Sequence, residues 1–183
     1  IYDIKKVPFN DYSHLWETNN KINGFSFPVV PIISNEHPEG LEFAKWWLMY
    51  READEKDRTK FNTLNCKIEN INKINTICNI FQHNHALMLV EGFYEKGKVI
   101  QFKGGRPMYL ACIYNEWLKD SSPIKTVSVL TREPNSFIEQ YHHRMPVILD
   151  AEMADIWIDN KFTIQDIHEM QPYFEDLELE IVE

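Results

Sequence analysis

The sequence predicts an α+β fold built on a largely antiparallel, curved sheet. Segments rich in aromatic and β-branched residues follow one another along the chain with short turns between them, which is typical of antiparallel strands. These segments do not alternate regularly with helical ones, which argues against a parallel, doubly wound sheet. The length of 183 residues favours one domain. A chain of this size buries roughly two-thirds of its unfolded surface.

The predicted strands share an apolar or alternating composition and are bounded by turn residues. The prolines in residues 25–33 predict an edge strand or a bulged strand. Gly104-Gly105, which separates residues 98–102 from residues 107–114, predicts a hairpin. The predicted strands are residues 25–33, 41–50, 86–90, 98–102, 107–114, 126–131 and 177–182.

The other segments are predicted to be helices, turns or loops. Pro134 suits the first turn of a helix that continues to about Tyr141. Asp150 is expected to cap a short helix over residues 151–158. Turns or loops are expected at residues 23–24 and 34–40, and a solvated loop or a short helix at residues 52–60.

The net charge argues against a nucleic-acid partner, but the distribution of charge weakens that argument. The chain carries a net charge of −9, whereas contacts to phosphate require cations. Residues 169–183 contain six acidic side chains and no Lys or Arg, so they contribute −6 of this net charge. A basic groove with Lys45, Lys67 and Arg144 therefore remains compatible with the composition. If the protein works on DNA, the acidic end is expected to lie away from that groove.

Several classes of function receive no support from the sequence. No apolar run approaches the ~20 residues of a membrane span, so no membrane partner is expected. Cys66, Cys78 and Cys112 form no CxxC pair, which indicates reduced thiols and a cytoplasmic location. His83-Asn84-His85 has no third ligand nearby in the sequence, and no glycine-rich phosphate loop is present. No metal ion and no cofactor are therefore expected.

Three short motifs become informative when they are considered together and in order. They are Asn65-Cys66-Lys67-Ile68-Glu69, then Gly92-Phe93-Tyr94-Glu95, then His142-His143-Arg144-Met145-Pro146. At these separations they resemble the SOS-response-associated peptidase (SRAP) family, over about residues 25–157. Members of that family recognise abasic sites in single-stranded DNA and bond to them covalently.

The resemblance implies a β pseudo-barrel flanked by helices, and one SRAP-like domain over residues 1–183. It also implies a nucleophilic cysteine directly after the initiator methionine, exposed when the protein removes its own first residue. This chain opens with Ile1-Tyr2-Asp3. We therefore expect a leading segment, with the first strand and the cysteine, to precede it, and we expect Ile1 to lie where that segment would lead toward the site.

The resemblance assigns catalytic roles to Asn65, Glu95 and His142. A carboxylate beside aromatic residues is partly shielded from water, which suits Glu95 to general acid or base chemistry. An imidazole titrates near physiological pH, so His142 can exchange a proton with a sugar oxygen or an imine. The amide of Asn65 can orient a ring-opened sugar. We expect these three side chains to converge on one concave site.

The resemblance also suggests contacts to DNA by Trp46, Lys67 and Arg144. Trp46 can stack on unpaired bases, although packing in the core is an equal alternative. Lys67, where the family has Arg, keeps a charge for phosphate but loses the planar fork. Arg144 can bind a phosphate or, equally, hold a carboxylate within the fold. Glu69 can orient Lys67.

The expected function is that of an abasic-site sensor that crosslinks to single-stranded DNA as a monomer. One alternative is a non-catalytic relative that binds nucleic acid or protein, with Asn65, Glu95 and His142 as remnants. Another is an unrelated α+β interaction domain. A cysteine in the second position of the full-length protein favours the chemistry, and any other residue there favours binding.

Overall fold

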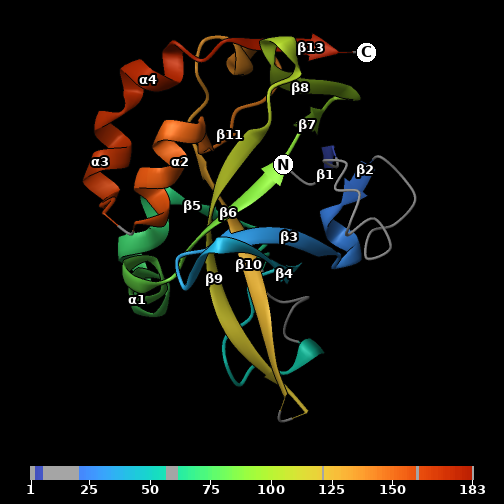
Figure 1. Ribbon diagram of the computed structural model, residues 1–183, viewed down its shortest axis with the longest axis vertical. Coiled ribbons are helices and arrows are strands. Elements are labelled where there is room, and N and C mark those ends of the chain that lie inside the picture. Colours follow the sequence, from blue (N-terminus) through green and yellow to red (C-terminus); the bar gives the residue numbers. More distant parts are fainter. Residues whose placement is uncertain (1–2, 6–20, 57–61, 121, 160, 183) are drawn as a thin grey trace.

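The computed structural model describes residues 3–5, 21–56, 62–120, 122–159 and 161–182 (Figure 1). Strands dominate this part of the chain, and helices flank them. The strands are β1 (Asp3–Lys5), β2 (Lys21–Asn23), β3 (Val29–Ser34), β4 (His37–Trp46), β5 (Asn65–Lys67), β6 (His85–Val90), β7 (Gly92–Glu95), β8 (Lys98–Phe102), β9 (Met108–Lys119), β10 (Ser122–Arg132), β11 (Met145–Pro146), β12 (Ile148–Leu149) and β13 (Leu179–Val182).

The larger sheet closes on itself and forms a pseudo-barrel, as predicted. Its ring follows the order β10-β4-β3-β6-β9 and returns to β10 through the β9–β10 pairing. The β3–β4, β3–β6, β6–β9 and β9–β10 pairs are antiparallel. The closing pair, β10 with β4, is parallel, with Thr126 opposite Lys45 and Val127 opposite Trp46. β5 and β11 extend the ring along the other end of β10.

The smaller sheet has the order β13-β8-β7-β1-β2. Its strands are antiparallel throughout, and β8 lies between β7 and β13. β6 belongs to the ring and β7 to this sheet, with Glu91 between them. The chain therefore changes sheets directly before Gly92.

Helices cover one side of the ring. The α-helices are α1 (Asn75–His83), α2 (Ala151–Ile158), α3 (Ile164–Glu169) and α4 (Gln171–Glu175), and the 3₁₀ segments include η2 (Gly24–Ser26), η4 (Ile68–Lys73), η5 (Lys103–Gly105) and η6 (Ile138–Gln140). Figure 1 shows α2, α3 and α4 together along this side, with α1 below them. Within the described residues, no helix is long and apolar enough to cross a membrane.

Three tryptophans anchor the core. Trp46, Trp117 and Trp157 are at most 2% exposed. Each indole N–H donates to a backbone carbonyl oxygen, those of Leu64, Ala53 and Ala86 respectively. Buried indoles normally find such a partner, because an unpaired polar group in the core costs free energy. The bond from Trp157 to Ala86 docks α2 onto β6.

The glycine pair after β8 does not form the predicted hairpin. β8 pairs with β7 and β13, whereas β9 belongs to the other sheet. η5 carries the chain across, with φ of 75° at Gly104 and 67° at Gly105. A pair of glycines indicates a change of direction, but it does not indicate which strand the chain joins next.

The first predicted strand is an interior strand rather than an edge strand. β3 begins at Val29 and lies between β4 and β6. The expected irregularity is present, because the β3–β4 register shifts between Ile32 and Ser34. The loop predicted over residues 34–40 is also wrong, since β4 already begins at His37 and ends at Trp46.

One predicted helix is wrong and the other is confirmed. Residues 134–141 contain the short η6 instead of a helix. The Asn135 side chain accepts from the backbone N–H of Ile138 at 2.9 Å, and such local bonds compete with helix formation. Asp150 does cap α2, because its Oδ1 accepts from the N–H of Met153 at 3.0 Å.

Gly92 sets how closely β7 approaches β8. A Cβ at this position would collide with the backbone carbonyl oxygen of Ile100, which no side-chain rotation can relieve. We expect Gly92→Ala to lower the free energy of unfolding by about 1–3 kcal/mol in chemical denaturation. Gly40→Ala is the matched control, because a Cβ at Gly40 meets nothing within 4 Å. Equal effects of the two substitutions would contradict this account.

Candidate functional site

Glu95 ends β7 directly before a tight turn into β8. Glu95 is opposite Lys98 in the β7–β8 pair. Lys96, with φ of 50°, and Gly97, with φ of 81°, complete a two-residue turn in which both central residues are left-handed. The Glu95 side chain is 10% exposed. The turn thus holds a carboxylate at the end of the strand and largely shields it from water.

His142 follows η6 and is held by its own loop. Its backbone N–H donates to the carbonyl oxygen of Ile138 at 2.9 Å. The ring atom Nδ1 lies 3.1 Å from the backbone nitrogen of Arg144 and 3.0 Å from its carbonyl oxygen. Among the described residues these contacts engage Nδ1, so Nε2 is the ring nitrogen available to exchange a proton.

Glu95 and His142 form a pair, although they are 47 positions apart in the sequence. Glu95 Oε1 lies 3.9 Å from His142 Nδ1. This distance exceeds that of a hydrogen bond, so the carboxylate faces the imidazole without a direct bond to it. The N–H of Arg144 favours the tautomer with the proton on Nε2, whereas the Arg144 carbonyl and Glu95 favour the proton on Nδ1. A ring with partners for both tautomers can donate or accept a proton at Nε2.

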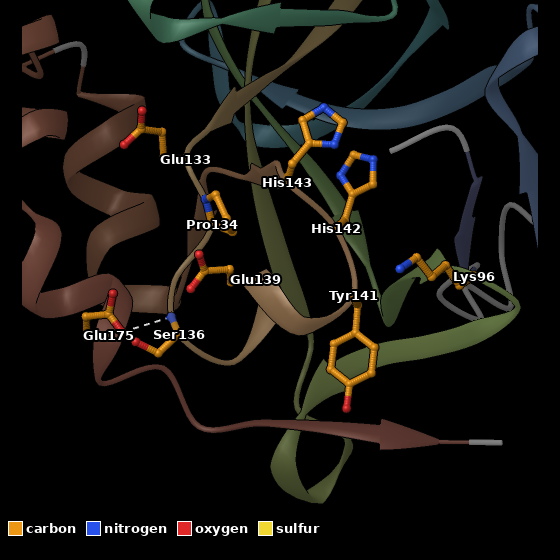
Figure 2. Close-up of a pocket in the computed structure, with 9 residues that line it drawn as sticks. All are labelled: Lys96, Glu133, Pro134, Ser136, Glu139, Tyr141, His142, His143 and Glu175. Carbon is orange, nitrogen blue, oxygen red and sulfur yellow. Dashed lines mark hydrogen bonds between the residues drawn. The ribbon is translucent and has the colours of Figure 1, made fainter.

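A pocket of about 540 Å³ opens beside His142 (Figure 2). Lys96 and His143 line it together with His142, and three carboxylates form the other part of its wall. These carboxylates belong to Glu133, Glu139 and Glu175. Glu175 is part of the acidic end of the chain, and its Oε2 accepts from the N–H of Ser136 at 3.1 Å. The acidic end is therefore in part close to His142, whereas its expected separation was from the groove of Lys45, Lys67 and Arg144.

Arg144 holds a carboxylate within the fold. Its guanidinium makes two parallel bonds to Glu69, Nη1 to Oε1 at 2.8 Å and Nη2 to Oε2 at 2.9 Å. Nη2 also donates to the carbonyl oxygen of Thr131 at 2.7 Å. Of the two roles considered for Arg144, this is the one that the geometry shows, and it ties the loop of His142 to η4 and β10. Glu69 therefore orients Arg144 rather than Lys67.

The Glu69–Arg144 pair should make stability depend on pH. Partial burial is the largest single influence and would raise the pKa of Glu69. The hydrogen bonds from Arg144, a backbone hydrogen bond and the charge of Arg144 together outweigh burial, so the pKa lies below its usual value. A lowered pKa in the folded state contributes stability above the unfolded pKa of about 4.3, which is lost as the pH falls further. We expect Glu69→Gln to cost about 1.5–3 kcal/mol at pH 7 and much less at pH 3, in urea denaturation. A cost independent of pH would contradict the ion pair.

Asn65 and Lys67 lie on β5, on the other side of this ion pair. β5 runs parallel to β10, with Asn65 opposite Val129 and Lys67 opposite Thr131. Both residues line a separate pocket of about 380 Å³, and the Lys67 side chain is exposed there. In the described part of the chain, the structure thus brings Glu95 and His142 together and places Asn65 on a neighbouring pocket.

Trp46 is a core residue in this structure. Its side chain is 0% exposed, and its indole N–H donates to the carbonyl oxygen of Leu64 at 3.0 Å. It therefore presents no face on which a base can stack. Its neighbour Trp47 is 7% exposed and lies with its ring centroid 6.3 Å from that of Phe25, which is 52% exposed.

His83 and His85 do not lie on one strand. His83 ends α1, whereas His85 begins β6 and is completely buried, stacked 3.9 Å from Trp157. The described residues contain no group of three or more His, Cys, Asp or Glu side chains that could hold a metal ion. The Cys66 thiol is also a poor nucleophile, because burial and the nearby Glu69 raise its pKa to about 11.

Asn135 positions the His142 loop and was missed by the sequence analysis. It is 1% exposed. Its Oδ1 accepts from the N–H of Ile138, and its Nδ2 donates to the carbonyl oxygen of Phe174 at 2.7 Å. The amide therefore joins η6 to α4. The sequence predicted a helix that begins at Pro134, so neither the turn at Asn135 nor its partner in α4 could be identified from it.

We expect Asn135→Ala to loosen the loop that carries His142. The substitution leaves a buried carbonyl oxygen and a backbone N–H without their partner, which should cost about 1–3 kcal/mol of unfolding free energy. Limited proteolysis should then cut within residues 136–143 sooner. Gln140→Ala is the matched control, because Gln140 is exposed and bonds only to Ser136 among the described contacts. Similar cleavage of both variants would count against this role.

The fold and site define a class of protein: a closed, mixed β-ring with flanking helices that carries a carboxylate–imidazole pair at a surface pocket. The family model described as SOS response associated peptidase (SRAP) matches residues 9–183. The chain belongs to this family.

Similar proteins agree with this assignment. The chain is 25% identical over 160 residues to the abasic site processing protein YoqW of Bacillus subtilis, a match that covers 81% of this chain and 71% of YoqW. It is 24% identical over 147 residues to the abasic site processing protein HMCES of Gallus gallus, covering 63% of this chain and 44% of HMCES. A solved structure from Bacteroides thetaiotaomicron has a TM-score of 0.76 at 22% identity, covering 94% of this chain and 82% of that one. Another from Bordetella bronchiseptica has a TM-score of 0.79 at 16% identity, covering 100% and 98%.

Proposed function

We propose that this protein acts on abasic sites in single-stranded DNA and bonds to them through a cysteine at its mature amino terminus. The proposal includes removal of the initiator residue by the protein itself. The observation that carries it is the Glu95–His142 pair, with 3.9 Å between carboxylate and imidazole. Membership of the family, together with relatives named abasic site processing proteins, supports a role at abasic sites.

The direction of β1 supports the proposal. β1 runs antiparallel to β7, with Ile4 opposite Phe93 and Lys5 opposite Gly92. The amino-terminal end of β1 therefore lies at the Glu95 end of β7. A segment that preceded β1 in the same direction would approach the Glu95–His142 pair. Ile1 itself, for which such a position was expected, lies outside the described residues.

The proposed reaction starts when the sugar of an abasic site opens and exposes an aldehyde. The α-amine of the cysteine, with an unperturbed pKa of ~8, attacks the aldehyde and forms an imine with loss of water. The thiolate then adds to the imine carbon, and the nitrogen takes up a proton, which closes a five-membered thiazolidine. His142 donates or accepts the proton of the sugar oxygen through Nε2. Glu95 moves protons at the amine, and Asn65 orients the sugar.

The contacts to DNA belong to the same proposal. Lys67, which is exposed, supplies a charge for phosphate. Arg144 and Trp46 support the DNA path indirectly, because they hold the fold together through their hydrogen bonds to Glu69 and Leu64. We propose that the protein acts as a monomer in the cytoplasm, where its three free thiols stay reduced.

The decisive experiment incubates the full-length protein with single-stranded DNA that contains one abasic site. We expect a species of lower gel mobility that survives denaturation. An oligonucleotide with tetrahydrofuran in place of the sugar is the matched control, because it has no aldehyde and should give no such species. Denaturation-sensitive binding to both oligonucleotides would instead support a non-catalytic module that binds nucleic acid. No binding to either would refute the proposal.

A further inference from the structure

The pocket of about 380 Å³ beside Asn65 has no role in the proposed chemistry beyond that residue. Its volume falls in the range of small-ligand sites, which is roughly 300–1,000 Å³. We propose that it holds one unpaired nucleobase of the strand whose abasic sugar lies at Glu95 and His142. This inference rests on the proposed function and extends it to a neighbouring nucleotide.

The floor of the pocket contains a polar group without a partner. Ser128 lines the pocket and is 0% exposed. Among the described residues, its Oγ has no hydrogen-bond partner. An unpaired buried hydroxyl costs free energy, which a ligand with donors or acceptors at its edge would recover. The amides of Asn65 and Asn70 lie on the same pocket and offer both kinds of group.

Part of the pocket wall is apolar, although Asn62, Thr63 and Lys67 also line it. Leu48 and Ile77 are 3% and 4% exposed, and Ile74 is an exposed apolar residue at 46%. Cys66 adds a neutral thiol, because burial, with Glu69 contributing, raises its pKa to about 11. Tyr50 contributes a half-buried aromatic ring. A partly apolar wall around a polar floor suits a planar ring with polar edges, which is the chemistry of a nucleobase.

The pocket is connected to the Glu95–His142 pair through the fold. β5 carries Asn65, and η4, which follows β5 directly, carries Glu69. The carboxylate of Glu69 holds Arg144, which is two residues after His142. Lys67 is exposed beside the pocket and supplies a cation for an adjoining phosphate. The proposal assigns the base in the pocket to the nucleotide next to the abasic sugar at the pair.

The test measures the affinity of the protein for single-stranded oligonucleotides that carry tetrahydrofuran as an unreactive abasic analogue. In one oligonucleotide both flanking positions carry bases. In two others the 5′ or the 3′ flanking base is also replaced by tetrahydrofuran. We expect one of these replacements to weaken binding by about tenfold, whereas the other has little effect.

Two variants and one control connect this preference to the pocket. Ser128→Leu fills the floor of the pocket, and Asn70→Ala removes an amide. Both variants should therefore bind the oligonucleotide with both flanking bases and the oligonucleotides that lack one of them with nearly equal affinity. Asn72→Ala is the matched control, because Asn72 lies on the same η4 segment but lines a different pocket. It should retain the preference. Asn70→Ala decides the question if Ser128→Leu does not fold.

The outcomes separate this inference from the proposed function. Wild-type binding that does not depend on either flanking base overturns the nucleobase pocket and leaves action on abasic sites intact. A preference that survives in both pocket variants also overturns it. No binding of any oligonucleotide by the wild-type protein overturns the proposed function and this inference together.

Discussion

Truncation of the chain after Gln171 is expected to unfold the protein. The removed segment contains Phe174, which is 0% exposed and lies 4.0 Å from the guanidinium of Arg132. It also contains β13, which pairs with β8 along four residues, from Leu179 to Val182. Loss of a buried phenylalanine alone costs about 3–5 kcal/mol, compared with a total stability of 5–15 kcal/mol for a typical domain. The cooperative thermal transition and the near-ultraviolet circular dichroism should both disappear.

The charge of this segment can be tested without removing it. The side chains of Asp176 and Glu178 are exposed, so Asp176→Asn with Glu178→Gln should keep the fold. This double variant is the matched control for the truncation. It also measures whether the acidic end repels DNA, which the truncation cannot do if it unfolds the protein. A truncated chain that melts cooperatively at the wild-type temperature would show that the segment is not part of the core.

Replacement of His142 by alanine should slow crosslinking to abasic DNA by about 10²–10⁴-fold, the usual contribution of general acid–base catalysis. Glu95→Gln should have a similar effect, because it removes the charge that faces His142 Nδ1 at 3.9 Å. Groups that act as a unit are not additive. The double variant should therefore be little slower than either single variant, in single-turnover reactions of the full-length protein.

His143→Ala is the matched control for this prediction. His143 lines the same pocket as His142, and the centroids of the two rings lie 4.4 Å apart. We expect its removal to change the crosslinking rate little. A large effect of His143→Ala together with a small effect of His142→Ala would assign the proton transfer to the other ring.

Much of the fold could be predicted from the sequence because local composition determined it. β8, the cap of α2 at Asp150 and the late strand β13 were predicted from patterns of two to six residues. The partners of the strands could not be predicted in this way. The alternation that identifies β8 is the same whether it continues into a hairpin or crosses to another sheet. Helices α3 and α4 were missed because they are short, with six and five residues. α1, with nine residues, was missed because it contains Asn, Thr and Ile residues, whose helix propensity is modest.

The candidate site was predictable in part. The motifs indicated Glu95 and His142, which the structure brings together. The roles of Trp46 and Arg144 could not be predicted, because they depend on which residues surround these side chains in the fold. A tryptophan in a strand can face the core or the solvent, and an arginine can hold a phosphate or Glu69. Asn135 acts through α4, which is far away in sequence, so no local pattern could have indicated its role.

The parallel pairing of β10 with β4 has a consequence for synthesis of the chain on the ribosome. Thr126 is opposite Lys45, so the ring cannot close until the segment up to β10 has emerged. Until then the edge of β4 that faces β10 stays unpaired, and pairing over such a long separation is intrinsically slow. His142 follows only ten residues after the end of β10. Barrel closure and delivery of the His142 imidazole should therefore be almost simultaneous, and a nascent chain that ends before Arg132 should be a substrate for chaperones.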